Sequence, residues 1–475
     1  MKKIFIYLVS MVLFASCVDN LDDFNVDQKK ASQVPPGTLF TGAVKNLTDV
    51  MTTPNVNTNN YRFYVQHWTS TQYLDEPRYN MTSRTIPQNM FQTLYRDVLM
   101  DLNDAKRLIQ ENDLMDPDVK DNQLAQVEMV EVYAWSILLN TFGDVPYSQA
   151  LNRDISLPAY DDAATVYNDI LTRLDAALDR IQLTADGFGN ADVLYDSDMA
   201  MWVKFGNSLK LKLAMVLADV SPDQAQSLVE EAAPNVFTSN ADNAAFPYLS
   251  NAPNNNPVSE NINPLRTSRE DYVPANTLVD AMNELEDPRR ARYFTQYNGE
   301  YKGGRYGFTN SYSEVSHVHD DIIALDFESL LLDYVEVEFL LAEAVERGFN
   351  VGGSAAEHYN AAVTASFDYW GAPGAAAYLA KPAVNYSSAS GDWKQKIGKQ
   401  KWIALYNRGF DAWLEWRRLD APTLLPPVVE GLDFTVPTRL IYPVNEQTLN
   451  GANRNAAADA IGGDQSSTKL WWDTN

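Results

Sequence analysis

The stretch KIGKQKWIALYNRGFDAWLEWRRL, from Lys396 to Leu419, organises the rest of the chain. Apolar residues recur in it at helical spacing, first through Ile403 and Leu405 and then through Trp413, and Gly409 is a residue suited to ending the first helix. Bulky rings on one helical stripe need a large partner surface to bury them. The stretch therefore predicts a helix pair that packs against distant parts of the chain.

Two adjacent arginines, Arg417 and Arg418, follow Trp413 and Trp416 in this stretch. Two interpretations are open. In the first, the rings belong to the core and the guanidinium groups bind helix-end carbonyls or acidic side chains; in the second, these residues contact a ligand. The first is favoured because large aromatic side chains are mostly buried in folded proteins.

Helical periodicity recurs along the chain and predicts a mainly α fold. Amphipathic helices come in pairs, which predicts four tetratricopeptide-like hairpins stacked as a solenoid body. The predicted hairpins span about 91–141, 163–219, 327–370 and 396–419. Irregular, insertion-rich segments separate or follow them, at about 235–326, 371–395 and 420–475. Because insertions of a solenoid tend to emerge on one face, that face is the predicted binding surface.

The N-terminus has the pattern of a secretory signal. Two lysines precede an apolar run from Ile4 to Phe14, and small residues follow it, so residues 1–16 are predicted to be a signal peptide. Cys17 is the only cysteine, which excludes an internal disulfide. Residues 17–60 are polar apart from one helical stretch and are predicted to be a tether and wrap, leaving 61–475 as a single domain.

Several of these segments resemble one family, the SusD/RagB outer-membrane nutrient-binding lipoproteins. The residues from Gln400 to Leu419 resemble the closing helical motif of that family, and the segment PTRLIYPVNE, 437–446, resembles the one that follows it. The segment FASC ending at Cys17 resembles a lipobox, although Phe14 departs from the usual leucine. The chain ending, Trp471-Trp-Asp473, points to one SusD-like branch.

The resemblance implies a cell-surface lipoprotein of the outer membrane, anchored through lipid on Cys17. It implies a non-catalytic protein that binds oligosaccharides or peptides and acts as a lid on a SusC-like TonB-dependent transporter. A protein of a different class is the alternative, because tetratricopeptide-like bodies also serve as scaffolds or in adhesion.

Charge and motifs exclude several other functions. The net charge of −26 argues strongly against nucleic acid as a partner. The sequence contains no nucleophile elbow, HExxH motif or phosphate loop, so we expect neither an enzyme nor a bound cofactor. An acidic cluster from Asp186 to Asp198 lacks the register of a calcium loop, and His317 and His319 lack a third ligand nearby. We therefore expect no metal site.

Aromatic and polar residues alternate between Tyr61 and Tyr79, a composition that suits sugar binding. Flat rings can stack on the C–H face of a pyranose while amides, carboxylates and guanidinium groups bind its hydroxyls. The same rings would also serve a helix that packs on the core, so both interpretations stay open for this stretch. In the segment 371–395, Trp393 is likewise a candidate for an exposed stacking platform because its neighbours are small and polar.

The predicted ligand site combines this stretch with insertion loops. A repeat body commits its helical stripes to the core, so a ligand is expected to meet aromatics outside those stripes. Four rings are predicted to stack on the ligand: Trp68, Tyr73, Tyr79 and Trp393. Three polar side chains are predicted to form hydrogen bonds with it: Asp75, Arg78 and Arg305. Tyr306 and Trp370 are predicted to complete the surface.

Overall fold

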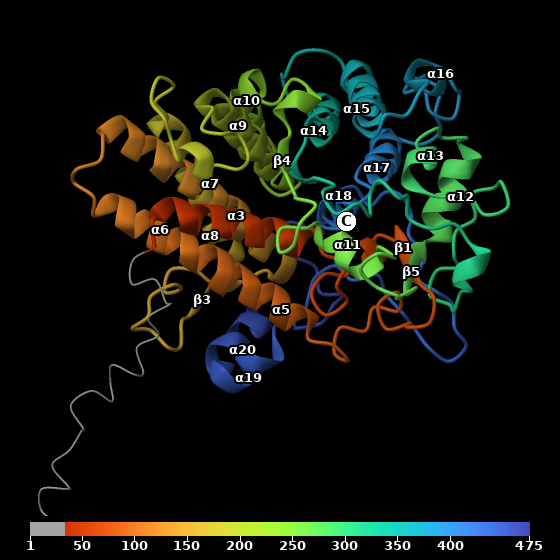
Figure 1. Cartoon of the computed structure of the whole chain (residues 1–475), viewed down its shortest axis with the longest axis horizontal. Coiled ribbons are helices and arrows are strands. Elements are labelled where there is room, and N and C mark those ends of the chain that lie inside the picture. Colours follow the sequence, from red (N-terminus) through yellow and green to blue (C-terminus); the bar gives the residue numbers. More distant parts are fainter. Residues whose placement is uncertain (1–33) are drawn as a thin grey trace, which may run out of the picture. The chain divides into compact units, whose positions relative to one another are not determined.

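A computed structural model describes residues 34–475, and Pro36–Asn475 form one compact unit (Figure 1). The predicted signal peptide and Cys17 lie outside the described residues. Most ordered segments are helices and the strands are short, so the predicted mainly α fold class is confirmed. Between residues 34 and 475, no helix combines the length and the apolar character needed to cross a bilayer.

Each of the four predicted hairpin ranges contains helices in the structure. Those of the first two ranges are α5 (Ile86–Gln92), the π-helical turn η1 (Thr93–Leu99), α6 (Met100–Gln110), α7 (Pro117–Phe142), α8 (Ala163–Arg180) and α9 (Met199–Val216). Those of the last two are α14 (Tyr334–Glu346), α15 (Ala355–Trp370), α17 (Trp393–Ala404) and α18 (Gly409–Leu419). Neighbouring helices in this order pack on one another, and α14 also packs on α9 and α17. Their stacking as a regular solenoid stays a prediction.

The strands form three antiparallel pairs that join distant segments. They are β1 (Trp68–Ser70) with β5 (Tyr272–Pro274), β2 (Val145–Pro146) with β3 (Tyr160–Asp161), and β4 (Ala244–Phe246) with β6 (Ser329–Leu332). Two of the pairs therefore fix the predicted insertion 235–326 to segments outside it.

Short helices occupy the remaining segments, including those predicted to be irregular. They are α4 (Tyr61–Tyr64), η2 (Gly189–Ala191), α10 (Pro222–Ala232), η3 (Ala233–Asn235), η4 (Asn240–Asp242), α11 (Pro257–Ile262), α12 (Asn276–Glu284), α13 (Arg290–Tyr293), η5 (Tyr312–Glu314), α16 (Ala375–Leu379), α19 (Val444–Leu449) and α20 (Gly451–Ala460).

The predicted tether and wrap contains a helix of the core, α3 (Pro36–Thr52). Phe40, Val44 and Leu47 are spaced by four and three residues and are fully buried. Figure 1 shows α3 lying along α6, and the two helices are in contact. This part of the segment 17–60 is therefore packed in the body, because one apolar stripe is enough to bury a helix.

The helix pair α17–α18 confirms the core interpretation of the tryptophan and arginine cluster. Trp413 is fully buried, and its indole N–H donates to the carbonyl of Pro437 at 2.6 Å. The guanidinium of Arg417 lies 3.5 Å from the centre of the Trp413 ring and 5.0 Å from that of Trp472. It also donates to the carbonyls of Asn140 (2.9 Å) and Thr438 (2.8 Å). A cation–π stack thus ties the C-terminal segment to α18.

Arg418 bridges three helices inside the protein. Its Nη2 lies 2.5 Å from Glu343 Oε2 of α14 and 3.0 Å from Glu415 Oε2 of α18, and its Nη1 donates to the carbonyl of Met215 in α9 at 2.7 Å. Lys401 of α17 pairs with Glu415 at 2.6 Å. These side chains are all at most 3% exposed. Buried charges persist only when they are paired in this way.

The role expected for Gly409 is wrong. It does not end α17, which stops at Ala404; it begins α18. Asn407, at φ 70°, takes the left-handed position in the turn between the two helices. A Cβ atom on Gly409 would lie 2.7 Å from the backbone nitrogen of Arg62, so glycine is needed there for close packing rather than for chain reversal.

A hydrogen-bond chain between α14 and α15 contains a titratable imidazole, that of His358. His358 Nδ1 lies 2.7 Å from Glu338 Oε2 and its Nε2 lies 3.0 Å from the carbonyl of Gly352. A carboxylate and a carbonyl oxygen both accept, so both contacts are hydrogen bonds when the imidazole is protonated and both ring nitrogens donate. The hydrogen bond to Glu338 raises the pKa of His358, against the opposing effect of burial.

Because its folded-state pKa is raised, His358 is expected to stabilise the fold fully below its unfolded pKa of about 6.5 and to lose this contribution as the pH rises through the folded value. Urea unfolding of the wild type and of His358→Gln at pH 6 and pH 9 measures this contribution. The wild type should exceed the variant in unfolding free energy by about 1 kcal/mol more at pH 6 than at pH 9, the scale by which a charged hydrogen bond exceeds a neutral one. An equal difference at both pH values would contradict the assignment.

Candidate ligand-binding site

The β1–β5 pair brings together two segments that the sequence analysis singled out. Trp68 pairs with Pro274 and Ser70 with Tyr272, so the Tyr61–Tyr79 stretch meets the insertion 235–326 at this small sheet. Beyond the pair, Thr71 donates a backbone hydrogen bond of 2.9 Å to the carbonyl of Asp271. Residues some 200 positions apart therefore share one surface.

A cavity of about 320 Å³ opens beside this strand pair. Mainly aromatic and charged side chains line it, together with one amide, one hydroxyl and one aliphatic side chain: Val56, Asn57, Ser70, Tyr73, Glu76, Arg84, Arg269, Asp271 and Tyr272. A volume of this size accommodates a small ligand or part of a longer one. The residue types match those that bind sugars, since rings and hydrogen-bonding groups converge on one space.

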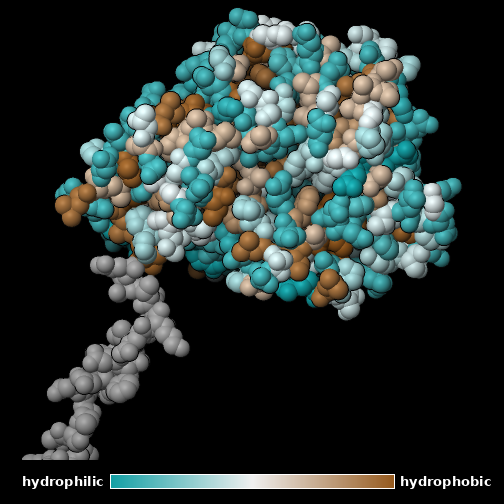
Figure 2. Space-filling model, turned by 45° about the horizontal axis from the view of Figure 1, so that its top comes forward, coloured by the Kyte–Doolittle hydropathy of each residue, from teal (hydrophilic) through white to brown (hydrophobic). Residues whose placement is uncertain are grey.

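Tyr73 gives this cavity a stacking platform. Its side chain is 56% exposed, and it is the only aromatic side chain classed as exposed among the described residues. The guanidinium of Arg84 lies 6.0 Å from the centre of its ring. Figure 2 shows one face of the molecule, on which brown apolar residues form separate patches among polar ones. Tyr73 therefore differs from the other described aromatic side chains, which are at least partly buried.

Two buried polar groups in the cavity lining lack partners among the described residues. Glu76 is 1% exposed; its Oε1 is paired with Arg84, whereas its Oε2 accepts no hydrogen bond. The hydroxyl of Ser70, also 1% exposed, has none either. Burial raises the pKa of the Glu76 carboxyl, and Arg84 opposes this shift. Unpaired buried groups are costly, so a ligand or water that hydrogen-bonds them would be stabilised there.

Of the predicted polar ligand contacts, Asp75 and Arg78 are used within the protein. The Asp75 carboxylate accepts from Asn80 Nδ2 at 3.2 Å and from Ser83 Oγ at 2.8 Å. Arg78 Nε donates to the carbonyl of Gly307 at 3.0 Å. These side chains therefore hold their loops, and neither lines the cavity beside Tyr73.

The predicted residues Tyr79, Tyr306 and Arg305 form a cluster next to Arg78. The rings of Tyr79 and Tyr306 lie 6.2 Å apart and are both less than 10% exposed. The hydroxyl of Tyr306 donates to the carbonyl of Phe63 at 2.7 Å. Arg305 is exposed and stacks on Phe308 at 3.6 Å. The two tyrosines are thus core residues, and Arg305 alone of the three is free to meet a ligand.

Trp68 is a core residue, which corrects its predicted role as a stacking platform. It is fully buried, its indole N–H donates to the hydroxyl of Tyr406 at 3.1 Å, and its ring stacks on Tyr272 with 6.0 Å between centres. The guanidinium of Arg62 lies 5.1 Å from the ring centre. The ring is buried because the side chains of Tyr272, Tyr406 and Arg62 surround it.

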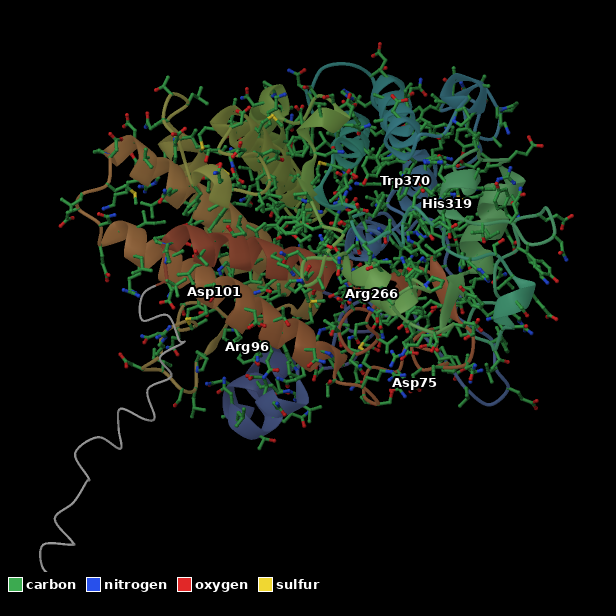
Figure 3. All side chains as sticks on the ribbon, in the orientation of Figure 1. Asp75, Arg96, Asp101, Arg266, His319 and Trp370 are labelled. Carbon is green, nitrogen blue, oxygen red and sulfur yellow. The ribbon has the colours of Figure 1, made fainter. Side chains whose placement is uncertain are left out.

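Trp370 and Trp393 do not line the cavity beside Tyr73. Trp370 is 8% exposed and packs on Tyr293 at 4.8 Å; Figure 3 labels it far above Asp75. Trp393 is half-buried as the first residue of α17, and the guanidinium of Arg347 lies 5.3 Å from its ring centre. The predicted site residues therefore belong to separate places, and only Tyr73 reaches the cavity.

The two histidines considered as metal ligands have other contacts. The ring of His317 stacks on Tyr312 at 3.8 Å, and His319 Nδ1 lies 3.5 Å from Asp321. Across residues 34–475, His, Cys, Asp and Glu side chains nowhere gather in a group of three that suits a metal ion.

Several cavity residues were missed by sequence reasoning. Glu76 lies inside the stretch Tyr61–Tyr79, where only the presence of charged residues among the aromatic ones could have indicated it. Arg269 and Asp271 carry no motif, and nothing in their local sequence indicates that they line the same cavity as Tyr73. Only the pairing of β1 with β5, which joins the two segments, reveals them.

The fold and the family model agree on the class of this protein. Residues 28–443 match the SusD-like_2 family, described as starch-binding and associating with the outer membrane, so the chain belongs to this family. The resemblance seen in the C-terminal motif is confirmed. Assignment to the branch with the Trp471–Asp473 ending stays a prediction.

Solved structures of the same fold include proteins named for chitin binding. One chitin-binding protein is 26% identical, with a TM-score of 0.80 over 93% of this chain and 100% of that one. A chitin-binding SusD homologue from Flavobacterium johnsoniae is 25% identical (TM-score 0.77; 92% and 99% covered). A SusD homologue from Bacteroides uniformis is 29% identical (TM-score 0.75; 92% and 99% covered). No curated protein that was compared matches the chain.

Proposed function

We propose that this protein is a non-catalytic lipoprotein of the cell surface that binds oligosaccharides in the cavity beside Tyr73 and delivers them to a SusC-like TonB-dependent transporter. The observation that carries the proposal is the exposed Tyr73 ring at a cavity lined by unpartnered and charged groups. The family description as starch-binding and the chitin-binding names of two structural relatives support a saccharide ligand.

The cavity offers the two kinds of contact that a pyranose needs. Its C–H face would stack on Tyr73, and its hydroxyls would donate to Glu76 Oε2 and Asp271 or accept from Arg269. The side chain of Arg269 is exposed, so it can turn toward a ligand. A peptide is the second ligand class, since the same groups bind amides, and belongs in any screen of ligands.

Replacing Tyr73 by alanine is expected to weaken saccharide binding by about five- to thirtyfold, which corresponds to about 1–2 kcal/mol for one well-packed aromatic contact. Calorimetric titration with chitin and starch oligosaccharides measures the loss. Because the side chain is largely exposed, the melting temperature should stay nearly unchanged.

The matched control is Tyr73→Trp, which keeps a flat ring at the cavity and should retain binding. Arg305→Ala is a second control, because Arg305 is exposed but does not line this cavity. Full affinity in Tyr73→Ala for every saccharide that binds the wild type would refute this location. A ligand that is cleaved by the protein would refute the non-catalytic role.

Anchoring through Cys17 is a separate part of the proposal, motivated by the lipobox-like FASC segment. Several acyl chains on one residue give stable membrane attachment, since each buried CH₂ contributes about 0.8 kcal/mol. Cys17→Ala is expected to move the protein from the membrane fraction to the soluble fraction on cell fractionation. Retention of the variant in the membrane fraction would contradict lipid anchoring.

Copurification distinguishes the proposed transport function from the scaffold or adhesion alternative. If the protein delivers its ligand to a transporter, we expect a TonB-dependent barrel to copurify with it in mild detergent. A scaffold or adhesion protein should copurify with no such barrel.

A further inference from the structure

A second open cavity lies over the helix pair α14–α15. Its volume is about 640 Å³, and it shares no lining residue with the cavity beside Tyr73. Figure 1 labels α14 and α15 well above β1 and β5, so the two cavities belong to different parts of the body. None of the site residues discussed above lines it.

Small side chains of α15 form the floor of this cavity. Ala361, Thr364 and Ala365 follow one another at spacings of three and one, which places them on one face of the helix. Ala241 of η4 adds another small side chain. Because none of these is bulky, the floor leaves room for a flat ring to lie on it.

Tyr334, the first residue of α14, supplies an aromatic wall of the cavity. Its side chain is half-buried. Its backbone nitrogen donates to Asn243 Oδ1 at 2.8 Å. A half-buried ring on an anchored backbone position has little freedom to lose when a ligand arrives, which lowers the entropic cost of binding.

Two asparagines that line the same cavity have unpaired hydrogen-bond acceptors. Asn240 Nδ2 donates to the carbonyl of Ala365 at 2.9 Å, which fixes the plane of that amide. Asn240 Oδ1 and Asn360 Oδ1 are buried atoms that accept no hydrogen bond from any described residue. Such acceptors favour a ligand that carries donor hydroxyl or amide groups.

The charge of the lining selects between ligand classes. Asp368 is its only ionisable side chain other than the tyrosine, and no arginine or lysine takes part. An anionic ligand would therefore find no counter-charge, whereas a neutral one with many hydroxyls would find an aromatic face, two amides and a carboxylate acceptor.

We propose that the cavity over α14–α15 is a second saccharide-binding site, specific for neutral sugars. The proposal takes its ligand class from the proposed function but stands on different residues. Two sites on one body bind a long polysaccharide more tightly than either site alone, because the second contact becomes intramolecular. This would favour retention of long chains at the cell surface.

The test counts binding sites on the full chain with chitohexaose and maltoheptaose as probes. Ala361→Trp fills the floor at a half-exposed position, and Tyr334→Ala removes the wall; Tyr334→Phe, the control, keeps the ring and loses only the hydroxyl. With the better probe, the wild type is expected to bind two molecules per chain. Ala361→Trp and Tyr334→Ala should each lower the affinity for one of the two ligand molecules at least fivefold. Tyr334→Phe should lower the affinity for either molecule by less than fivefold.

The Tyr73→Ala variant makes the two proposals separable. If Tyr73→Ala weakens the binding of one ligand molecule and Ala361→Trp weakens the binding of the other, both sites are supported. If Ala361→Trp weakens binding and Tyr73→Ala does not, only the second site is supported. A single bound molecule that is unaffected by Ala361→Trp in a folded variant, judged by circular dichroism, overturns the second site, as does the absence of binding by the wild type.

Discussion

Replacing Arg418 by methionine is expected to lower the free energy of unfolding by about 3–5 kcal/mol, the usual result of removing one partner from a buried ion pair. Methionine keeps most of the side-chain volume but removes the charge. Glu343 and Glu415, which are 0% and 3% exposed, would then face each other with less compensation. The carbonyl of Met215 would also lose its donor.

Urea unfolding of the full chain, followed by circular dichroism, measures this change. The matched control is Arg96→Met, because Arg96 also pairs with a carboxylate, Asp97, but is 68% exposed. An exposed pair contributes about 0–1 kcal/mol. If the two variants lose similar stability, the charges around Arg418 do not hold α9, α14 and α18 together.

Replacing Trp68 by alanine is expected to destabilise the fold by about 3–5 kcal/mol, the usual range for a buried tryptophan. The substitution would leave a cavity between Tyr272 and the guanidinium of Arg62, and the hydroxyl of Tyr406 would lose its donor. Thermal and urea unfolding measure the loss.

Tyr73→Ala is the matched control for Trp68→Ala, since it removes an aromatic ring from the same segment at a largely exposed position. We expect little change in melting temperature for that variant. A Trp68→Ala protein with wild-type stability and weakened saccharide binding would contradict the core assignment and restore Trp68 as a ligand contact.

The candidate site was only partly predictable. The aromatic stretch Tyr61–Tyr79 contains part of the candidate cavity, and Tyr73 lines the cavity there. Composition could not separate Tyr73 from Trp68 because both are aromatic residues among polar neighbours. Trp68 is fully buried because Tyr272, Tyr406 and Arg62 surround its ring, whereas Tyr73 lies beyond the strand pair and is exposed.

The sequence by itself determined the mainly α class, the positions of the long helices and the family. These follow from periodicity and from local motifs such as the one that ends at Leu419, which report on neighbours in the chain. The tertiary structure alone decided which side chains from separate segments line one cavity, such as Tyr73 with Arg269 and Tyr334 with Asn360. These groupings depend on strand pairing and helix packing, which fix the position of each side chain in space without leaving a local pattern in the sequence.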